Sequence, residues 1–503
     1  MTGASLNGVE AVPVTVEVAV GSGIPGMSIV GMADTAVQEA KERVRAAIRA
    51  SGFSMPAEKI VVNLAPGDLR KSGSGFDLPI ALGILASTGQ VDRGALKGRM
   101  FVGELSLDGG AREVAGSLAY CICASKLGLG YVSPSSQRVP LRGMEQMQIS
   151  HLAQMRHGDG ARELPPFAGE GAGEAEEARL DYADVCGHDA AKRALQVAAA
   201  GSHCLLMVGP PGSGKTMLAS RLPSILPPLG EAEMLQSAAV HSVAGEDIAP
   251  LLAGHRPYRS PHHSSTMAGL LGGGSPAKPG EVSLSHNGVL FLDELAEFKP
   301  SVLQGLRQPI EEGFISITRA AGKVRMPASF LLVAATNPCP CGHLGDPDHD
   351  CTCSSGMVVR YQSRIGGPLI DRFRMQLDIQ RMPSSDVLSG VKGTSSASLR
   401  EGVERAREFC SWRESREGEC VNPGDSPARS GSRGRADVPI SMSDDARAFA
   451  EAMAEEMKLS GRSLIGSLKV ARTIADMEES EDVAAEHLAE AFGYRLDDRI
   501  GCA

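Results

Sequence analysis

The 503 residues suggest roughly three domains of ~150 residues each, and a hydrophobic share of 42% supplies apolar material for several cores. The formal net charge of −10 excludes a surface coated in positive charge, so any contact with nucleic acid has to be local, such as a lined channel. Eleven cysteines without a basic leader indicate a reducing cytoplasm, and no apolar run approaches the ~20 residues of a membrane span.

Residues 1–155 predict an α+β domain of ordinary size. Valines alternate with other residues from Val12 to Val20, which predicts a strand with one buried face. Asp34 and Asp77 each precede an apolar helical pattern and are expected to cap it. In chain order, the other elements expected here are strands at 28–31 and 59–64 and helices at 35–50 and 78–85.

Three segments of this region resemble a known family. They are Ile29–Asp34, Glu42–Ile48 and Val62–Pro79, the last of which reads V-N-L-A-P-G-D-L-R-K-S-G-S-G-F-D-L-P. Together they resemble the YifB/ComM family of Mg-chelatase-like AAA+ ATPases, and the resemblance continues through almost the whole chain. It implies that residues 1–155 have the fold of the Lon protease domain.

A Lon-type protease needs a serine nucleophile beside a lysine base. Ser72 and Ser74 lie in the segment that resembles the nucleophile loop, but the best register places Gly75 where the serine should be. The lysine should follow in a stretch that contains none, because no Lys occurs between Lys97 and Lys126. We therefore expect a catalytically inactive domain that is structural or binds a partner.

A change in composition separates this region from the rest of the chain. Residues 156–179 are rich in Gly, Ala, Glu and Pro, which predicts a flexible acidic linker. The resemblance implies that an AAA+ core with a parallel sheet follows at 180–383, and a C-terminal helical lid at 384–503. In the family, the backbone at the positions of Val185 and Cys186 brackets the adenine.

One segment near the start of the core reads G-x-x-x-x-G-K-T, the phosphate-binding P-loop. It follows the apolar run 204–208, which suits a buried parallel strand, and precedes a segment that can continue as a helix. The glycines let successive N–H groups point at phosphates, and the helix adds its positive N-terminal end. Lys215 is expected to reach the β- and γ-phosphates of ATP, and Thr216 to hold Mg²⁺. The predicted ATP-binding set is Gly209, Pro210, Pro211, Gly212, Ser213, Gly214, Lys215 and Thr216.

Two later apolar strands end in polar residues. Residues 288–294 resemble Walker B, in which Asp293 would bind Mg²⁺ and Glu294 would orient and polarise the attacking water. Residues 331–337 end in Asn337, which the resemblance makes sensor 1, the residue that positions the water near the γ-phosphate. The alternatives are an acidic helix cap for the first pair and a turn-forming Asn for Asn337.

A trans-acting arginine is expected near the end of the core. Residues 367–373 resemble the family's Leu-x-Asp-Arg segment, and Arg372 is the candidate arginine finger, which reaches the γ-phosphate of a neighbouring subunit. Arg360 and Arg364 are the other candidates for this role. The role requires an oligomer. The alternative is an intramolecular salt bridge to Asp371 or another carboxylate.

The core also carries two insertions. Residues 256–274 resemble the helix-2 insert of the Mg-chelatase and MCM clade, and His262 and His263 within it are expected to serve the loop or hydrogen-bond, because adjacent side chains rarely converge on one metal ion. The second insertion, at 315–327, alternates on both sides of a turn and predicts a β-hairpin. In the clade, the matching hairpin projects into the central pore of the ring.

The predicted hairpin carries three cations at or near its tip. They are Arg319, Lys323 and Arg325. Six copies in a ring would hold a phosphate backbone despite the acidic total charge, so these residues are the candidate DNA contacts. The alternative is a hairpin with solvated charges.

A cysteine cluster follows the sensor segment. Cys339 and Cys341 are separated by nine residues from Cys351 and Cys353, and four thiolates can bind Zn²⁺ tetrahedrally. Cys-x-Cys is tighter than the usual Cys-x-x-Cys spacing. Structural zinc and reduced thiols in an ordered loop therefore remain two interpretations.

The remaining residues predict a helical lid. Apolar and charge spacing indicates helices at 399–412, 444–459, 464–477 and 486–494, with Ser443 as a cap. A Ser-, Gly-, Arg- and Pro-rich segment at about 414–437 predicts a flexible loop. Arg462 lies in a segment that matches the family's lid and is the sensor 2 candidate; the alternative is a solvated arginine at a helix end.

The resemblance implies a cytoplasmic ATPase that uses ATP and Mg²⁺. It further implies a ring, a hexamer in the family, that acts on branched or single-stranded DNA as a helicase or branch-migration factor in recombination and natural transformation. Two other classes remain open. One is a chelatase-like remodeller of a protein or metal-insertion complex, and the other is an assembly scaffold that binds ATP as a switch.

Overall fold

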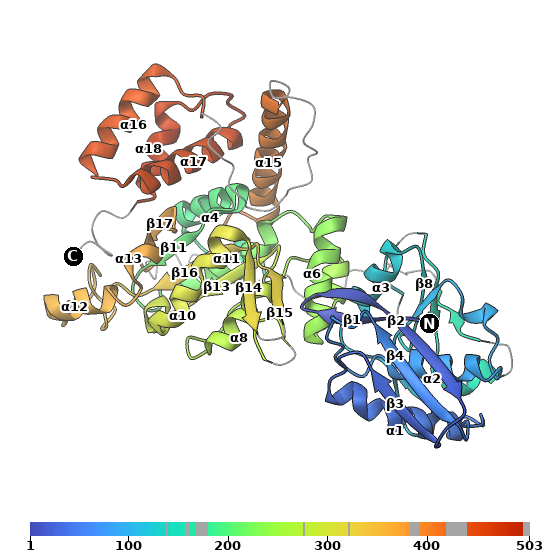
Figure 1. The fold of residues 1–503 in the computed structure, drawn as a ribbon. Helices are drawn as coiled ribbons and strands as arrows, with labels where there is room; N and C mark the ends of the chain where they lie inside the picture. The colour runs from blue at the N-terminus through green and yellow to red at the C-terminus, as the bar shows by residue number, and fades with distance from the viewer. Residues whose placement is uncertain are drawn as a thin grey trace.

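The computed structural model describes most of the chain. The described residues are 1–136, 138–141, 143–156, 160–165, 180–274, 277–319, 322–382, 393–418 and 440–495. Figure 1 shows three parts in sequence order: an N-terminal part built on one sheet, a central part built on a second sheet, and a group of C-terminal helices at the other end.

The N-terminal part is a mixed sheet of eight strands in the order β10-β9-β8-β5-β1-β2-β4-β3. Val14 and Val16 are buried, whereas Pro13, Thr15 and Glu17 between and beside them are exposed, so the alternation predicted for this strand is confirmed. The strands are β1 Thr2–Asn7, β2 Glu10–Gly21, β3 Gly26–Val30, β4 Lys59–Ala65, β5 Arg99–Phe101, β8 Gly130–Ser133, β9 Gln146–Gln148 and β10 Arg162–Glu163, with a separate pair β6 Glu104–Leu105 and β7 Ala111–Arg112. Its helices are α1 Thr35–Ala50, α2 Asp77–Ser87 and α3 Ser117–Lys126.

The two predicted aspartate caps have different outcomes. Asp34 caps α1, and its side chain accepts a hydrogen bond from the backbone N–H of Val37 at 2.9 Å. The prediction for Asp77 is wrong, because α2 begins at Asp77 itself and the buried carboxylate accepts from Arg43 Nε at 2.6 Å and from the backbone N–H of Leu105 at 3.2 Å. Burial raises the pKa of Asp77 to about 6, although the bond from Arg43 lowers it.

Part of the predicted linker belongs to this sheet. Arg162 and Glu163 form β10, which pairs antiparallel with β9, and the backbone N–H of Leu164 donates to Gln146 O at 2.9 Å. Residues 166–179 of the predicted linker lie outside the described residues.

The central sheet has five parallel strands in the order β12-β13-β16-β11-β17. They are β11 Leu205–Val208, β12 Tyr258–Arg259, β13 Val289–Leu292, β16 Leu331–Thr336 and β17 Met375–Asp378. Neighbouring residues of a strand enter different cores: Leu205 and Met207 face a core shared with α4 (Asp189–Gly201), whereas Leu206 and Val208 face a core shared with α10 (Pro300–Gly305). Because helices cover both faces, the three inner strands β13, β16 and β11 are apolar except for Thr336 at the end of β16, as their sequence indicates.

The other helices of the central part are mostly short. They are α5 Lys215–Ser220, α6 Glu231–Ala244, α7 Ala249–Leu252, α8 Met267–Leu271, α9 Glu281–Leu284, α11 Arg307–Glu312, α12 Ser355–Gln362 and α13 Gly367–Ile370. The predicted hairpin is confirmed as β14 Phe314–Arg319 paired with β15 Gly322–Pro327.

The C-terminal helices pack on α4, on the same face of the central sheet. They are α15 Ser396–Gly418, α16 Asp444–Glu456, α17 Gly461–Met477 and α18 Ala485–Gly493. Ser443 caps α16 through the backbone N–H of Ala446, as predicted, whereas α15 continues past Trp412 into the segment expected to be a loop. Residues 419–439 lie outside the described residues.

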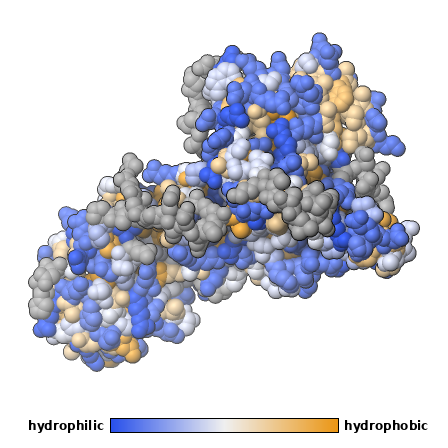
Figure 2. All heavy atoms as spheres, turned by 180° about the vertical axis from the view of Figure 1, so that it is seen from behind, coloured by the Kyte–Doolittle hydropathy of each residue, from blue (hydrophilic) through white to orange (hydrophobic). Residues whose placement is uncertain are grey.

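Hydrophilic side chains dominate the face seen in Figure 2, and apolar side chains gather mainly over the C-terminal helices. Among the described residues, no helix combines the length and the apolar character needed to cross a membrane.

The N-terminal part contacts the central part at α6 and at the hairpin. The backbone N–H of Gly116, just before α3, donates to Ser242 O in α6 at 2.9 Å. Val9, in the turn between β1 and β2, belongs to a small buried cluster with Met326 of β15. At Gly8, in the same turn, an added Cβ would lie 2.5 Å from Cγ1 of Val324. The base of the hairpin is thus held against the first sheet.

We expect Gly8→Ala to destabilise the protein by about 1–3 kcal/mol more than Gly128→Ala. Both glycines have a positive φ, +69° and +65°, so both substitutions strain the backbone similarly. Only Gly8 faces another side chain, because nothing lies within 4 Å of a Cβ built at Gly128. Urea unfolding of the two variants measures the difference in the free energy of unfolding. Equal decreases in the two variants would mean that the turn at Gly8 is not tightly packed against the hairpin.

Candidate nucleotide-binding site

The P-loop motif forms the connection between β11 and α5. Gly212 and Gly214 adopt positive φ angles of +79° and +85°, which glycine tolerates without a Cβ penalty. At Gly209 the backbone passes so close to the Ile379 carbonyl that any Cβ would collide with it. The helix begins at Lys215, directly after the loop. The eight residues therefore have the strand–loop–helix context that a phosphate-binding loop requires.

Lys215 is buried beneath the loop. Its Nζ donates to the carbonyl oxygens of Gly209 and Pro210, both at 2.8 Å, and lies 3.5 Å from Oδ1 of Asn337. Burial lowers the pKa of Lys215, and Asp293 opposes that shift. The ammonium and the Asn337 amide, predicted from segments far apart in sequence, therefore meet beside the loop.

Thr216 and Asp293 meet at the carboxyl ends of β11 and β13. The Thr216 hydroxyl donates to Oδ2 of Asp293 at 2.7 Å, and the other carboxylate oxygen accepts from the backbone N–H of Glu294 at 2.9 Å. A hydroxyl and a carboxylate at the edge of a phosphate-binding loop are the hard oxygen donors that Mg²⁺ takes. These residues fit the metal that the sequence predicts here.

Glu294 has a partner that sequence reasoning missed. His263 Nδ1 lies 2.9 Å from Oε2 of Glu294, while His262 bonds Ser264 within its own loop. Glu294 adopts a left-handed conformation with φ +51°, which turns it out of the strand direction just after Asp293. The expectation of a hydrogen bond is thus confirmed for His262, whereas His263 makes an ion-pair contact with Glu294. The signal that could have singled out His263 is its place after the strand that neighbours Walker B.

The two candidate arginines converge on one carboxylate. Arg372 Nη2 is hydrogen-bonded to Oε1 of Glu311 in α11, and Arg462 Nη2 lies 3.5 Å from the same oxygen. Arg372 also donates to Pro368 O, and its Nε is buried without a hydrogen-bond partner. The intramolecular ion pair that the sequence left open is therefore present, although Glu311 rather than Asp371 makes it.

Of the alternative arginines, Arg364 pairs with Glu297 at 3.2 Å, and Arg360 is exposed on α12. Val185 and Cys186, expected near the adenine, precede α4, where Val185 is buried and its carbonyl accepts from Lys192 Nζ at 2.6 Å. Val185 therefore belongs to the core that α4 shares with one face of the central sheet.

Similarity to known proteins extends over almost the whole chain. The family described as subunit ChlI of Mg-chelatase matches residues 16–136, and the family described as magnesium chelatase, subunit ChlI, matches residues 181–387. The family of the ChlI C-terminal region matches residues 393–495. The chain is 42% identical to the uncharacterized protein YifB of Salmonella typhimurium and 40% identical to the competence protein ComM of Haemophilus influenzae. Both alignments cover 98% of this chain and 96% of the relative.

The chain belongs to the YifB/ComM family of magnesium-chelatase-like AAA+ ATPases. That family uses ATP with Mg²⁺, in agreement with the meeting of Lys215, Thr216 and Asp293 at one sheet edge. The resemblance seen in the sequence is thereby confirmed.

In the hairpin of this YifB/ComM chain, the three cationic residues lie at different distances from the turn. Arg319 pairs with Gly322 beside the turn, and Lys323 pairs with Thr318 one position further back. Arg325 pairs with Ser316, and its guanidinium lies 3.4 Å from the ring centroid of Phe314 near the base. The expectation of three charges at or near the tip is therefore wrong for Arg325. The side chains of Arg319 and Lys323 lie outside the described atoms.

The four cysteines after β16 come together. Cys339 Sγ lies 3.4 Å from that of Cys341 and 3.7 Å from that of Cys351, and the sulfurs of all four, Cys353 included, lie within 4.8 Å of one another. The backbone N–H of His343 is the largest cause that lowers the pKa of Cys341 to about 5. Four sulfurs at this spacing fit a tetrahedral zinc ion.

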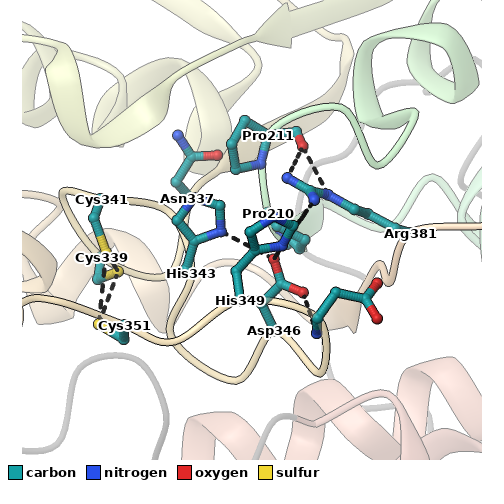
Figure 3. Close-up of polar contacts among 12 residues, drawn as sticks. Pro210, Pro211, Asn337, Cys339, Cys341, His343, Asp346, His349, Cys351 and Arg381 are labelled. Carbon is teal, nitrogen blue, oxygen red and sulfur yellow. Dashed lines mark hydrogen bonds and ion pairs between the residues drawn. The ribbon is translucent and has the colours of Figure 1, made fainter.

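A second polar cluster follows within the same loop. His343 Nδ1 lies 3.0 Å and His349 Nδ1 lies 3.5 Å from Oδ2 of Asp346, whose side chain is only 1% exposed. Arg381, after β17, lies 3.9 Å from the same oxygen and 3.2 Å from His349 Nδ1. Figure 3 shows this cluster between the cysteines and the P-loop. Sequence reasoning did not single out Asp346 or Arg381.

Proposed function

We propose that this chain is the subunit of an ATP-driven ring motor that acts on DNA. The observation that supports it most is the meeting of Lys215, the Thr216–Asp293 pair and Asn337 at the carboxyl edge of one parallel sheet. In open α/β sheets, ligands bind at this edge, and here it carries every group that hydrolysis of a nucleoside triphosphate needs from one subunit.

In the proposed reaction, the loop N–H groups and Lys215 bind the phosphates, and Thr216 and Asp293 hold Mg²⁺, which neutralises the developing charge. Glu294 orients and polarises the attacking water, and His263 fixes the position of its carboxylate. Asn337 positions the water near the γ-phosphate. Phosphate oxygens would replace the loop carbonyls as acceptors for Lys215, since they carry full charge.

Arg372 completes the site of a neighbouring subunit in this proposal. Glu311 holds Arg372 and Arg462 together, so the two cations lie side by side. The Arg372 side chain is 9% exposed, so it would leave Glu311 to reach the phosphate of a neighbour. A ring, which we take to be a hexamer, follows from the need for such a neighbour. Each turnover would then move the C-terminal helices against the core and shift the hairpin.

Two observations support DNA as the substrate. One relative is named a competence protein, and the hairpin brings Arg319 and Lys323 to its turn. Positive charge repeated around a pore binds a phosphate backbone without reading sequence, which suits branch migration or strand separation during recombination and transformation. The N-terminal part is proposed to be a Lon-like domain without protease activity, and its contact with the hairpin gives it a supporting role.

ATPase assays with forked or four-way DNA test this proposal, since stimulation by DNA is expected. Neutralising Arg319 and Lys323 together should weaken DNA binding and reduce the slope of log affinity against log salt, because fewer counterions are released. Lys97→Ala with Lys126→Ala is the matched control, since it removes the same charge from exposed sites in the N-terminal part. An unchanged salt slope in the hairpin variant would exclude a hairpin contact with phosphates.

A chelatase-like remodeller is the second candidate, because residues 181–387 match the magnesium chelatase subunit. For a remodeller of this kind, we expect an ATP turnover rate that does not rise when DNA is added. The same assay therefore separates the two candidates.

The proposed cofactors are ATP, Mg²⁺ and one structural Zn²⁺. The zinc would bind the four thiolates after β16, which the spacing of their sulfurs supports. Zinc would neutralise the charge of the thiolates and would hold the two ends of the loop 339–353 in a fixed geometry.

A further inference from the structure

The loop between Cys339 and Cys353 has almost no apolar material of its own. Apart from Cys339 and Gly342 its residues are partly or fully exposed, and its one large apolar side chain, Leu344, is 39% exposed. A polar segment of this kind cannot be ordered by hydrophobic burial. What orders it in the structure is the cysteine cluster at its ends and the buried carboxylate of Asp346 at its centre.

Asp346 organises the middle of the loop. It accepts from His343 Nδ1 and, through its other oxygen, from the backbone N–H of Asp348, both at 3.0 Å. The buried side chain also lies 3.9 Å from Arg381 Nη1. A buried carboxylate needs such partners, so the loop and the guanidinium stabilise each other.

Arg381 connects this cluster to the P-loop. Its Nε and Nη2 donate to the carbonyl oxygen of Pro211 at 3.2 and 3.1 Å, while Nη1 faces His349 and Asp346. On the other side of Pro211, Gly342 approaches so closely that an added Cβ would lie 2.7 Å from Pro211 Cδ. The loop therefore approaches Pro211 directly at Gly342 and also through Arg381, whose contacts with Pro211 and with His349 are drawn in Figure 3.

We propose that the metal-bound cysteine loop is a support for the P-loop, and that Asp346 and Arg381 are the positioning residues that transmit this support to Pro211. The inference rests on the proposed ATP and zinc sites. With the metal bound, the loop keeps Asp346 and His349 against Arg381, and the guanidinium keeps the Pro211 carbonyl turned away from the phosphate side. Loss of the metal frees the loop, and the P-loop then has to be ordered by the nucleotide itself, which lowers nucleotide affinity.

The test uses the full-length chain and two independent measurements: zinc content by mass spectrometry, and the Kd for a fluorescent ADP analogue. We expect one zinc per chain in the wild type, in Arg381→Ala and in Asp346→Asn. Both variants should bind ADP about tenfold more weakly, the effect of losing a charge-assisted hydrogen bond. Their kcat at saturating ATP should stay within about twofold, since neither residue contacts the reacting atoms. Asp350→Asn removes the same charge from an exposed position of the loop and should change neither quantity.

Removal of the metal with a chelator gives the decisive comparison. Stripping the wild type should weaken ADP binding about tenfold, and adding zinc back should restore it. Stripping Arg381→Ala should have little further effect, because the connection is already broken. An equal loss in both proteins would overturn the role of Arg381. Two metal ions per chain would also overturn it, since Asp346 and His349 would then be ligands.

Failure of this inference is separable from failure of the proposed function. ADP affinity and zinc content are measured without DNA and without turnover. A wild type that binds ADP and hydrolyses ATP but holds no zinc would refute the support mechanism and leave the ATPase intact. A protein that holds zinc but binds no nucleotide would refute the proposed function.

Discussion

Replacing Arg372 with alanine is expected to lower ATP turnover about 10³–10⁵-fold, the range found for arginine fingers, while ATP still binds. The guanidinium would neutralise charge that develops on the γ-phosphate in the transition state only, so its loss appears in kcat. Arg372→Lys should recover little activity, because an ammonium cannot reproduce the planar fork of donors. Steady-state ATPase assays and nucleotide titration measure the two quantities separately.

A mixing experiment decides whether Arg372 acts on a neighbouring subunit. Lys215→Ala cannot bind nucleotide but still offers Arg372, whereas Arg372→Ala binds nucleotide and lacks the finger. If the site is shared, mixing the two inactive proteins should restore measurable turnover. Arg416→Ala is the matched control, since Arg416 forms an exposed pair with Glu481 and is expected to change turnover little. If the two variants assemble together but the mixture shows no ATP turnover, Arg372 does not act across the interface.

Glu294→Gln is expected to bind ATP normally and to lose turnover by about 10²–10⁴-fold, the usual contribution of a positioned general base. Glutamine keeps the size of the side chain, but it cannot accept the proton of the attacking water. The variant should therefore trap the ATP-bound state, which single-turnover assays with nucleotide titration would detect.

The matched control is Glu297→Gln, which makes the same change three residues away on a side chain that pairs with Arg364. It should retain normal turnover. Normal turnover in Glu294→Gln would instead remove the assigned role and favour the helix-cap alternative.

These two predictions depend on side chains that the sequence indicated by different means. Glu294 follows an apolar strand and directly precedes the short 3₁₀ helix Leu295–Glu297, so its position after the buried β13 could be predicted from the apolar run alone. Arg372 was singled out by resemblance, and its ion pair with Glu311 joins residues 61 positions apart in the sequence. Nothing in the local pattern around either residue encodes that contact.

Asp77 illustrates how a local rule was overridden by packing. An aspartate before an apolar helix is a common cap, because its side chain can accept a hydrogen bond from the first turn. Here the helix starts one residue earlier than expected, and the carboxylate is buried with Arg43 as its partner. The arginine comes from α1, which the sequence predicted correctly but could not orient.

The sequence by itself determined the features that are contiguous. The P-loop, the apolar strands before each polar site residue, the hairpin and the cap at Asp34 all depend on neighbours within a few positions, so residue type and spacing were sufficient. Only the tertiary structure decided which distant groups meet. His263 reaches Glu294, and Arg381 bridges Asp346 and Pro211, because the strand order β12-β13-β16-β11-β17 brings the ends of these strands to one edge. Two arginines share Glu311 because residues from α11 and α17 meet in the fold. Strand order is set by how whole helices cover both sheet faces, and that packing has no signature in a short stretch of sequence.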